Sequence, residues 1–249
     1  MANLICAIDP FCEIYVARVA EDSFGITSER VAKIEFRSIK AIDWARSKEV
    51  DVISMSFVIG DSNDNLVQAL RRASDDGIVM TCSTHDEGSR IIKAYPAGHK
   101  SDTMSIIVLA ACDEYGKLLR NIEDSNDYDY MLQGQDVAAG IVPFLNSKDT
   151  ISGSSVATAL AAGLCSLILT CDRFANPGKK YAPGITDKES RLVMVKYHLE
   201  SMKSNEKSRF VLLEKFGNID APRIGQTFPD VFGGPSAKSV LQERFRMKG

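Results

Sequence analysis

The chain has 249 residues, of which 45% are hydrophobic and 25% charged, and its 30 basic and 33 acidic residues give a formal net charge of −3. This length is enough for one large domain or two small ones with a sizeable buried core. The mixed, nearly balanced charge gives no electrostatic reason to expect nucleic acid or an anionic membrane as a partner.

In the first half of the chain, apolar strand-like runs alternate with helical patterns. Residues 1–8 are typical of the end of a helix, because Asp9-Pro10 follows and proline disfavours helix in the residue before it. The elements expected after it, in chain order, are a strand at 12–19, a helix at 28–48, a strand at 50–57, a helix at 65–76 capped by Asp64 and ended by Gly77, strands at 77–82 and 104–112, and a turn at 113–116. Nearly all-apolar strands that alternate with helices predict a parallel sheet with helices on both faces.

The second half is more polar. Residues 121–150 predict an irregular segment, and 151–171 form a stretch of 21 residues without a charge. That length is close to the ~20 residues that span a bilayer, but the small residues of its first half and its weakly basic flanks favour the central helix of a large core. Two polar helices are expected near 187–202 and 206–215, followed by a loosely packed end. We therefore predict a main domain at 1–175 and a helical and loop extension at 176–249.

The cysteines indicate a reducing environment. They are dispersed, without a CxxC pair, at Cys6, Cys12, Cys82, Cys112, Cys165 and Cys171. Most of them lie in apolar runs, where a reduced cysteine behaves as a small hydrophobe, and a disulfide framework is unusual in a chain of this size. Because residues 1–9 also lack the pattern of a signal peptide, we expect an intracellular, cytoplasmic protein.

The segment from Ser152 to Gly163 places a serine after a glycine at the start of a predicted helix, with small residues at most later positions. A helix N-terminus carries partial positive charge and free N–H groups, which favour an oxyanion that develops beside such a serine. The same pattern is also typical of a serine that caps a buried, alanine-rich helix.

This segment resembles the serine motif of the subtilisin family, Gly-Thr-Ser-Met-Ala-x-Pro-His-x-Ala-Gly. The matching residues are Gly153, Ser154, Ser155, Val156, Ala157, Ala162 and Gly163. The resemblance implies that Ser155 is the catalytic nucleophile. Ala159 and Leu160 stand where the family usually has proline and histidine, neither of which belongs to its catalytic triad.

Residues 78–88 are similar to the family's strand that ends in Ala-Gly-Asn-Glu-Gly, whose asparagine donates a hydrogen bond to the oxyanion. Asp86 takes the place of that asparagine. An ionised carboxylate would repel the oxyanion, so Asp86 is either protonated or leaves this role to backbone N–H groups. In a subtilisin, loss of one such donor lowers turnover by about 10²–10³. A plain turn at Asp86-Glu87-Gly88 remains the alternative.

Residues 44–57 are similar to the family's helix and strand that end in Asn-Met-Ser-Leu-Gly, whose edge pairs with the substrate backbone. The resemblance implies that Ser56, Phe57 and Val58 bind substrate. Val58 replaces the glycine that leaves room for a substrate side chain, which predicts a narrower pocket. The alternative is a core strand without substrate contact.

Residues 1–19 resemble the end of the helix that begins with the family's catalytic histidine, together with the following strand. In this register the histidine would lie roughly four residues before Met1, and the aspartate further upstream, because subtilisins order their triad Asp, His, Ser. We therefore expect a three-layer subtilisin-like fold that lacks the N-terminal strand and the start of the histidine helix. The spacing of the chain's three histidines, His85, His99 and His198, gives no reason to place any of them beside Ser155.

Three functional hypotheses follow. The chain is part of a serine endopeptidase that cleaves peptide bonds through an acyl-enzyme on Ser155 and is inactive as it stands. Alternatively, it is a degenerate subtilase fold that acts as a non-catalytic binding or regulatory module, or it is an unrelated parallel α/β protein. The expected partner is a polypeptide or peptide-like ligand. No cofactor or metal is expected, because the acidic residues at 123–129 lack a calcium-loop pattern and favour a solvated loop.

Overall fold

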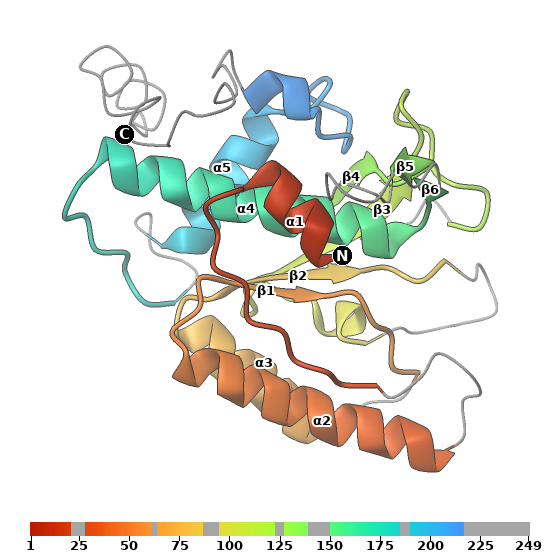
Figure 1. The fold of residues 1–249 in the computed structure, drawn as a ribbon, viewed down its shortest axis with the longest axis vertical. Coiled ribbons are helices and arrows are strands. Elements are labelled where there is room, and N and C mark those ends of the chain that lie inside the picture. The colour runs from red at the N-terminus through yellow and green to blue at the C-terminus, as the bar shows by residue number, and fades with distance from the viewer. Residues whose placement is uncertain are drawn as a thin grey trace.

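The computed structural model describes residues 1–20, 28–60, 64–86, 95–122, 127–138, 150–184 and 190–216. Their centre is a parallel sheet in the order β1 (Val52–Met55), β2 (Val79–Ser83), β3 (Ile106–Cys112) and β4 (Tyr130–Gln133), shown in Figure 1. The predicted parallel α/β fold is confirmed. A two-stranded antiparallel ribbon, β5 (Val137–Ala138) with β6 (Thr150–Ile151), lies beyond β4 in the sequence.

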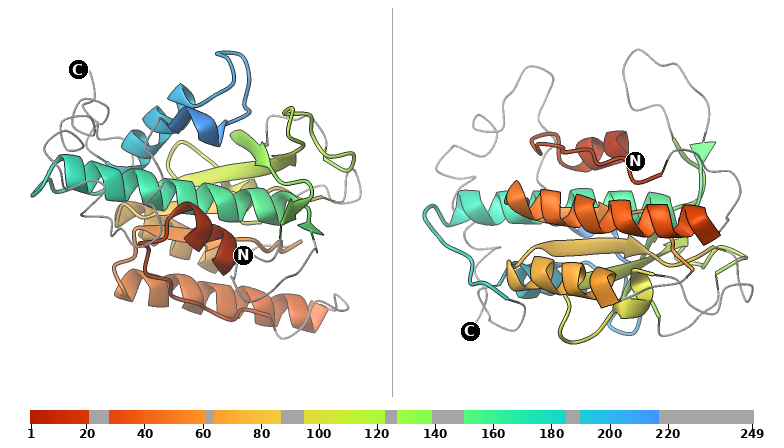
Figure 2. Two further views of the ribbon diagram at one scale, coloured as in Figure 1. Left: turned by 45° about the horizontal axis from the view of Figure 1, so that its top comes forward. Right: turned by 90° about the horizontal axis from the view of Figure 1, so that it is seen from below.

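Helices cover both faces of the sheet (Figures 1 and 2). The long helix α4 (Ser154–Ala175) contacts all four parallel strands, and both α1 (Ala2–Ile8) and α5 (Arg191–Ser201) pack against it. On the other face, α2 (Ser28–Ser47) packs against α3 (Asp64–Asp75). Two 3-10 turns, at Ala97–His99 and Leu213–Phe216, complete the described elements. The helices predicted at 28–48 and 65–76 are thereby confirmed.

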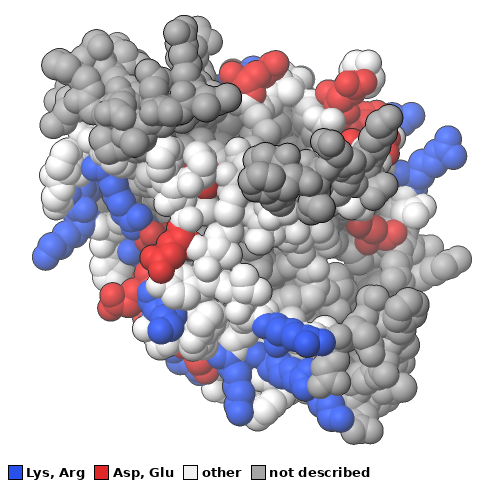
Figure 3. All heavy atoms as spheres, in the orientation of Figure 1, with Lys and Arg blue, Asp and Glu red and all other residues white. Residues whose placement is uncertain are grey.

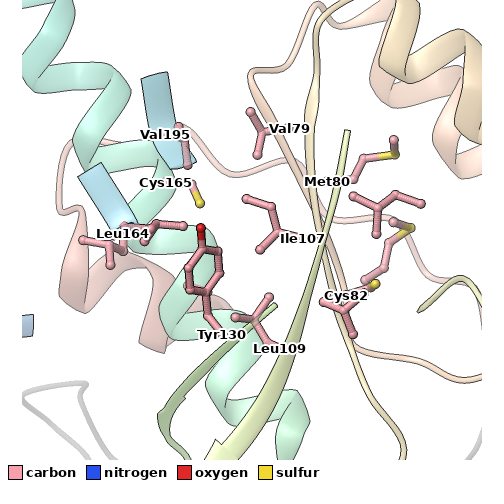
Figure 4. Packing of buried hydrophobic residues seen from close by; sticks show 14 of the residues in the cluster. Val79, Met80, Cys82, Ile107, Leu109, Tyr130, Leu164, Cys165 and Val195 are labelled. Atoms are coloured by element: carbon pink, nitrogen blue, oxygen red, sulfur yellow. The ribbon is translucent and has the colours of Figure 1, made fainter. Parts of the chain in front are cut away.

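The core lies on both sides of β2 and β3, every residue of which is buried. Figure 4 shows Leu164 and Cys165 of α4, with Val195 of α5, on one side of these strands and Met80 pointing to the other side. Strands that are covered on both faces need apolar side chains in both directions, which explains their nearly continuous apolar sequence.

Helix α4 is the central core helix that the sequence favours. It is the one described helix that is long and apolar enough to cross a membrane, and 78% of its most apolar window is buried inside the protein. Its residues on all sides meet protein, since the strands, α1 and α5 surround it. This burial accounts for the 21-residue run without a charge.

Close packing joins α1 to α4 at Gly163. A Cβ atom at this position would lie 2.8 Å from the Ile5 carbonyl oxygen and 2.9 Å from the Ile8 Cβ. The buried carboxylate of Asp9, just after α1, accepts a 2.6 Å hydrogen bond from the Ser166 hydroxyl of α4. The absence of a side chain at Gly163 and the buried hydrogen bond between Ser166 and Asp9 therefore hold α1 against α4.

The strand predicted at 12–19 is wrong. These residues form no strand after the turn that ends α1, and Tyr15 and Val16 are exposed, Val16 by 76%. Figure 1 shows the segment running beside β1 and α2. The β-branched and aromatic residues predicted a strand from local pattern alone, but no described strand pairs with them.

Other boundaries also differ from the predictions. Strand β1 is shorter than the predicted 50–57, and β4 lies within the predicted irregular segment 121–150. The helix predicted at 206–215 is wrong, because Phe210 forms a bridge to β4 and Val211 one to Lys203. Both β4 and the stretch around Phe210 are extended because they pair with segments distant in sequence. Neither stretch has a local pattern that indicates this pairing.

The acidic stretch near 127 is only partly a solvated loop. The carboxylate of Asp129 accepts a 2.9 Å hydrogen bond from Val108 N of β3 and forms a 2.9 Å ion pair with Lys100. Glu123, Asp124 and the C-terminal residues 217–249 lie outside the described residues.

The helix predicted at 187–202 appears as α5, and the six cysteines are free thiols. The division into 1–175 and 176–249 stays a prediction.

Candidate active site

The predicted nucleophile segment lies at the carboxyl edge of the parallel sheet, where open α/β sheets place their ligand sites. Gly153 precedes α4 with a φ of 133°, a conformation that favours glycine, and its N–H donates to the Gly134 carbonyl after β4 at 2.8 Å. A Cβ at Gly134 would lie 2.9 Å from the Gly153 carbonyl oxygen. Two glycines in close contact therefore hold the start of α4 against the end of β4.

Two consecutive serines at this point have different environments. Ser154 is fully buried, and its hydroxyl accepts a 3.1 Å hydrogen bond from Ala111 N of β3. Ser155 is only partly buried, and its hydroxyl makes one long contact, of 3.4 Å, to the Ser56 carbonyl. Ser154 thus supports the sheet, whereas the Ser155 hydroxyl has a single long contact.

Asp86 lies at the same helix end. Its Oδ2 accepts a 2.8 Å hydrogen bond from Ser154 N and would be 2.8 Å from a Cβ at Gly153. Its Oδ1 is buried without a partner among the described residues. The carboxylate therefore binds the positive end of the α4 dipole, the position that would otherwise favour an anionic group beside Ser155.

The residues predicted to bind substrate follow β1 directly. Ser56 contacts the site twice, through its carbonyl and through its hydroxyl, which donates to the Ser155 carbonyl at 3.3 Å. Phe57 is partly buried and packs against the core, and the Val58 side chain is exposed. The structure therefore brings Ser56, Ser155 and Asp86 together, while Val58 is open to solvent.

No histidine joins this group. None of His85, His99 and His198 forms a hydrogen bond with Ser155 in the structure. His99 stacks on Tyr95 with ring centroids 4.4 Å apart, and burial lowers its pKa. His198 is buried in α5, and the Nδ1 atom of His85 is buried without a partner in the described part of the chain.

Comparison with known proteins shows the family of the chain. The model of the Subtilase family, Peptidase_S8, matches residues 10–207. The chain belongs to the subtilase family. Among curated proteins, this subtilase is similar to the minor extracellular protease Epr of Bacillus subtilis (strain 168), with 23% identity over 131 residues. The match covers 52% of this chain and 19% of Epr, so the chain spans about one fifth of that relative's length.

Solved structures support the fold of the subtilase. A mutant of the protease domain of PatA has a TM-score of 0.57 at 15% identity, over 91% of this chain and 70% of that one. The prenylagaramide maturation protease PagA has a TM-score of 0.55 at 16% identity, over 79% of this chain and 69% of that one. Both likenesses concern the fold, and they confirm the predicted subtilisin-like architecture.

The sequence did not reveal two supporting residues of the candidate site, Gly134 and Ala111. The contact of Gly134 with Gly153 and the bond from Ala111 to the Ser154 hydroxyl join segments about 20 and 43 residues apart in sequence. Two adjacent serines at a helix start did indicate that one of them contacts the sheet, since only one of two neighbours on a helix can face it. Within the described ranges, no group of three or more His, Cys, Asp or Glu residues could hold a metal ion.

Proposed function

We propose that this subtilase contributes the nucleophile of a serine endopeptidase, Ser155, and that the chain by itself does not cleave peptide bonds. The observation that carries the proposal is the half-buried Ser155 hydroxyl at the start of α4, 3.4 Å from the Ser56 carbonyl. The Ser155 N–H lies in the first turn of the helix, where it has no partner within the helix. It is therefore suited to donate to an oxyanion on a substrate that acylates Ser155.

The proposed inactivity follows from the missing base. A serine hydroxyl needs a general base within about 3 Å to become a nucleophile. None of the chain's histidines is bonded to Ser155, and loss of the histidine lowers turnover by about 10⁶ in a subtilisin. We expect the substrate class to be a polypeptide, in line with the family.

Fluorophosphonate labelling with added imidazole tests this proposal. Imidazole is a small base that can reach a partly exposed hydroxyl, so it should replace the missing histidine. We expect slow labelling of Ser155 that imidazole accelerates at least tenfold, and none in Ser155→Ala, with the site identified by peptide mass spectrometry. Fast labelling without imidazole would refute the proposed inactivity.

The second candidate function is a non-catalytic module that binds peptides. One observation favours it: the Asp86 carboxylate lies where an oxyanion would need positive potential. This candidate predicts that imidazole accelerates labelling neither in the unmodified chain nor in Asp86→Asn. If Asp86→Asn restores the imidazole effect, the endopeptidase proposal stands and the carboxylate is the group that suppresses it.

A further inference from the structure

Two of the six cysteines differ from the rest in their accessibility. Cys6 is exposed and Cys12 is partly exposed. The other four are buried, namely Cys82, Cys112, Cys165 and Cys171. Buried cysteines behave as small hydrophobes and are chemically inert. Core packing therefore explains those four, but it does not explain Cys6 and Cys12, and the candidate active site uses neither of them.

The fold brings Cys6 and Cys12 together at the end of α1. Ile5 contacts α4 at Gly163, and Cys6, the next residue, lies about 100° further round the helix, where it is exposed. The chain turns directly after α1, because the Cys12 N–H donates to the Asp9 carbonyl at 3.3 Å. This turn carries Cys12 back toward the last turn of α1.

The two thiols are in direct contact. The Cys12 thiol shares a hydrogen bond with the sulfur of Cys6. A disulfide has an S–S distance of about 2 Å and Cβ atoms roughly 3.8 Å apart, so two sulfur atoms in contact need only a short movement to reach this geometry. The bond would close a loop of residues 6–12, which belongs to one helix end and its turn and involves no other element.

The surroundings of the two thiols determine the order in which they react. Burial raises the pKa of the Cys12 thiol, and the Asp9 carboxylate and Cys6 raise it further. Because the thiolate is the attacking form, Cys12 is a poor first nucleophile, and a dissolved oxidant reaches the exposed Cys6 more easily. The contact between the thiols then places Cys12 beside the sulfur that it has to attack.

We propose that Cys6 and Cys12 are a redox-active dithiol, which a small disulfide such as oxidised glutathione converts into an intramolecular disulfide. The Cys6 thiolate displaces one thiolate of the oxidant and forms a mixed disulfide, and the Cys12 thiolate then attacks the Cys6 sulfur and displaces the other. The two cysteines lose two electrons and two protons, and the oxidant leaves as two thiols. The inference does not depend on catalysis at Ser155.

The disulfide acts on the contact between α1 and α4. The loop that it closes contains Asp9, whose carboxylate accepts a hydrogen bond from the Ser166 hydroxyl of α4. A disulfide restricts the unfolded chain more than the folded one, so the oxidised protein should open α1 from α4 less often. Oxidation therefore stabilises the packing of α1 on the helix that begins at Ser154 and carries Ser155.

Equilibration of the purified chain in glutathione buffers of graded redox potential tests the proposal. Trypsin releases both cysteines in one peptide, residues 1–18, in which mass spectrometry detects the disulfide as the loss of two hydrogen atoms. We expect the equilibrium constant for this disulfide against glutathione to be at least tenfold larger in the folded chain than in urea, because folding holds the thiols in contact. Hydrogen exchange of the α1 amides should be slower in the oxidised protein.

Single substitutions separate the roles of the two thiols. Cys12→Ser should trap Cys6 as a mixed disulfide with glutathione, whereas Cys6→Ser should leave Cys12 at least tenfold slower to react. The matched control, Cys112→Ala, removes a buried thiol and should not change the formation of the disulfide. A mixed disulfide at Cys6 that persists in the unsubstituted chain would overturn the proposal, and so would equal equilibrium constants in the folded and the unfolded chain.

Discussion

At the scale of single residues, the site depends on two adjacent serines with opposite surroundings. The Ser154 hydroxyl satisfies a buried N–H of β3, and the Ser155 hydroxyl makes one long contact. A buried donor without its acceptor costs more than the net value of a hydrogen bond, because it loses its solvation and gains nothing. The two serines should therefore respond differently to the same substitution.

We predict that Ser154→Ala lowers the free energy of unfolding by about 1–3 kcal/mol, because it leaves the Ala111 N–H unpaired. Ser155→Ala should change it by less than about 0.5 kcal/mol. Urea denaturation followed by circular dichroism measures both. Equal losses in the two variants would contradict the supporting role of Ser154 and the proposed catalytic role of Ser155.

Asp86 provides a second comparison at this scale, because it accepts a hydrogen bond at the start of α4. We predict that Asp86→Ala destabilises the fold by about 1 kcal/mol, the usual cost of losing a cap at a helix N-terminus. Asp86→Asn keeps an acceptor oxygen and should lose less. Denaturation midpoints of both variants check this, and an unchanged midpoint in Asp86→Ala would be evidence against capping.

At the scale of elements, the contact between α1 and α4 determines where the N-terminal segment lies. Gly163 allows the backbone of α1 to touch α4, and Asp9 binds Ser166 on the same helix. The extended residues that follow α1 then form one wall of a cavity beside β1. Packing at a single glycine thus affects both the position of α1 and the course of the segment that follows it.

We predict that Gly163→Ala destabilises the protein by about 1–3 kcal/mol, the usual cost of an extra methyl group in a tightly packed contact. The control is Gly60→Ala, where an added Cβ would meet no atom within 4 Å. Hydrogen exchange should show faster opening of α1 in the Gly163 variant only. Equal effects of the two substitutions would mean that α1 does not pack as described.

At the scale of the whole molecule, charge and burial determine how stability depends on pH. Figure 3 shows basic and acidic side chains interspersed on one face, in line with the small net charge of −3. The core, in contrast, holds thiols that titrate only at high pH. Burial raises the pKa of Cys165 from its ordinary value of 9.0 to about 12, and burial likewise raises that of Cys82.

These thiols predict a loss of stability in alkali. Above pH 9 the unfolded chain releases protons that the folded chain keeps, so the free energy of unfolding falls as pH rises. Each such thiol contributes a slope of about 1.4 kcal/mol per pH unit, and for Cys165 it extends from pH 9 to about 12. Cys165→Ala should remove that part of the slope, as measured by urea denaturation at several pH values.

The matched control is Val195→Ala, which truncates a buried neighbour of Cys165 that cannot titrate (Figure 4). It should lower stability by a similar amount at every pH, because it creates a cavity without changing proton binding. If Cys165→Ala leaves the alkaline slope unchanged, the thiol does not stay protonated in the folded protein.

The sequence by itself determined the elements with strong local signals. The periodicity of α2 and α3, the uncharged run of α4, the nearly all-apolar strands β2 and β3, and the glycine–serine pattern before α4 were sufficient to predict the layered fold and a serine at the start of α4. Such features depend on neighbours three or four residues apart, or on burial from all sides, and both leave a pattern in one short stretch.

Only the tertiary structure decided the rest. Residues 12–19 have the composition of a strand, yet none of the described strands pairs with them, and the polar stretch around β4 is a strand because β3 and the stretch 209–211 lie beside it. The tertiary structure also turned Asp86 toward the start of α4, where it accepts a hydrogen bond from Ser154 N. Contacts between segments distant in sequence carry no local pattern, so their energies act only once the chain has folded.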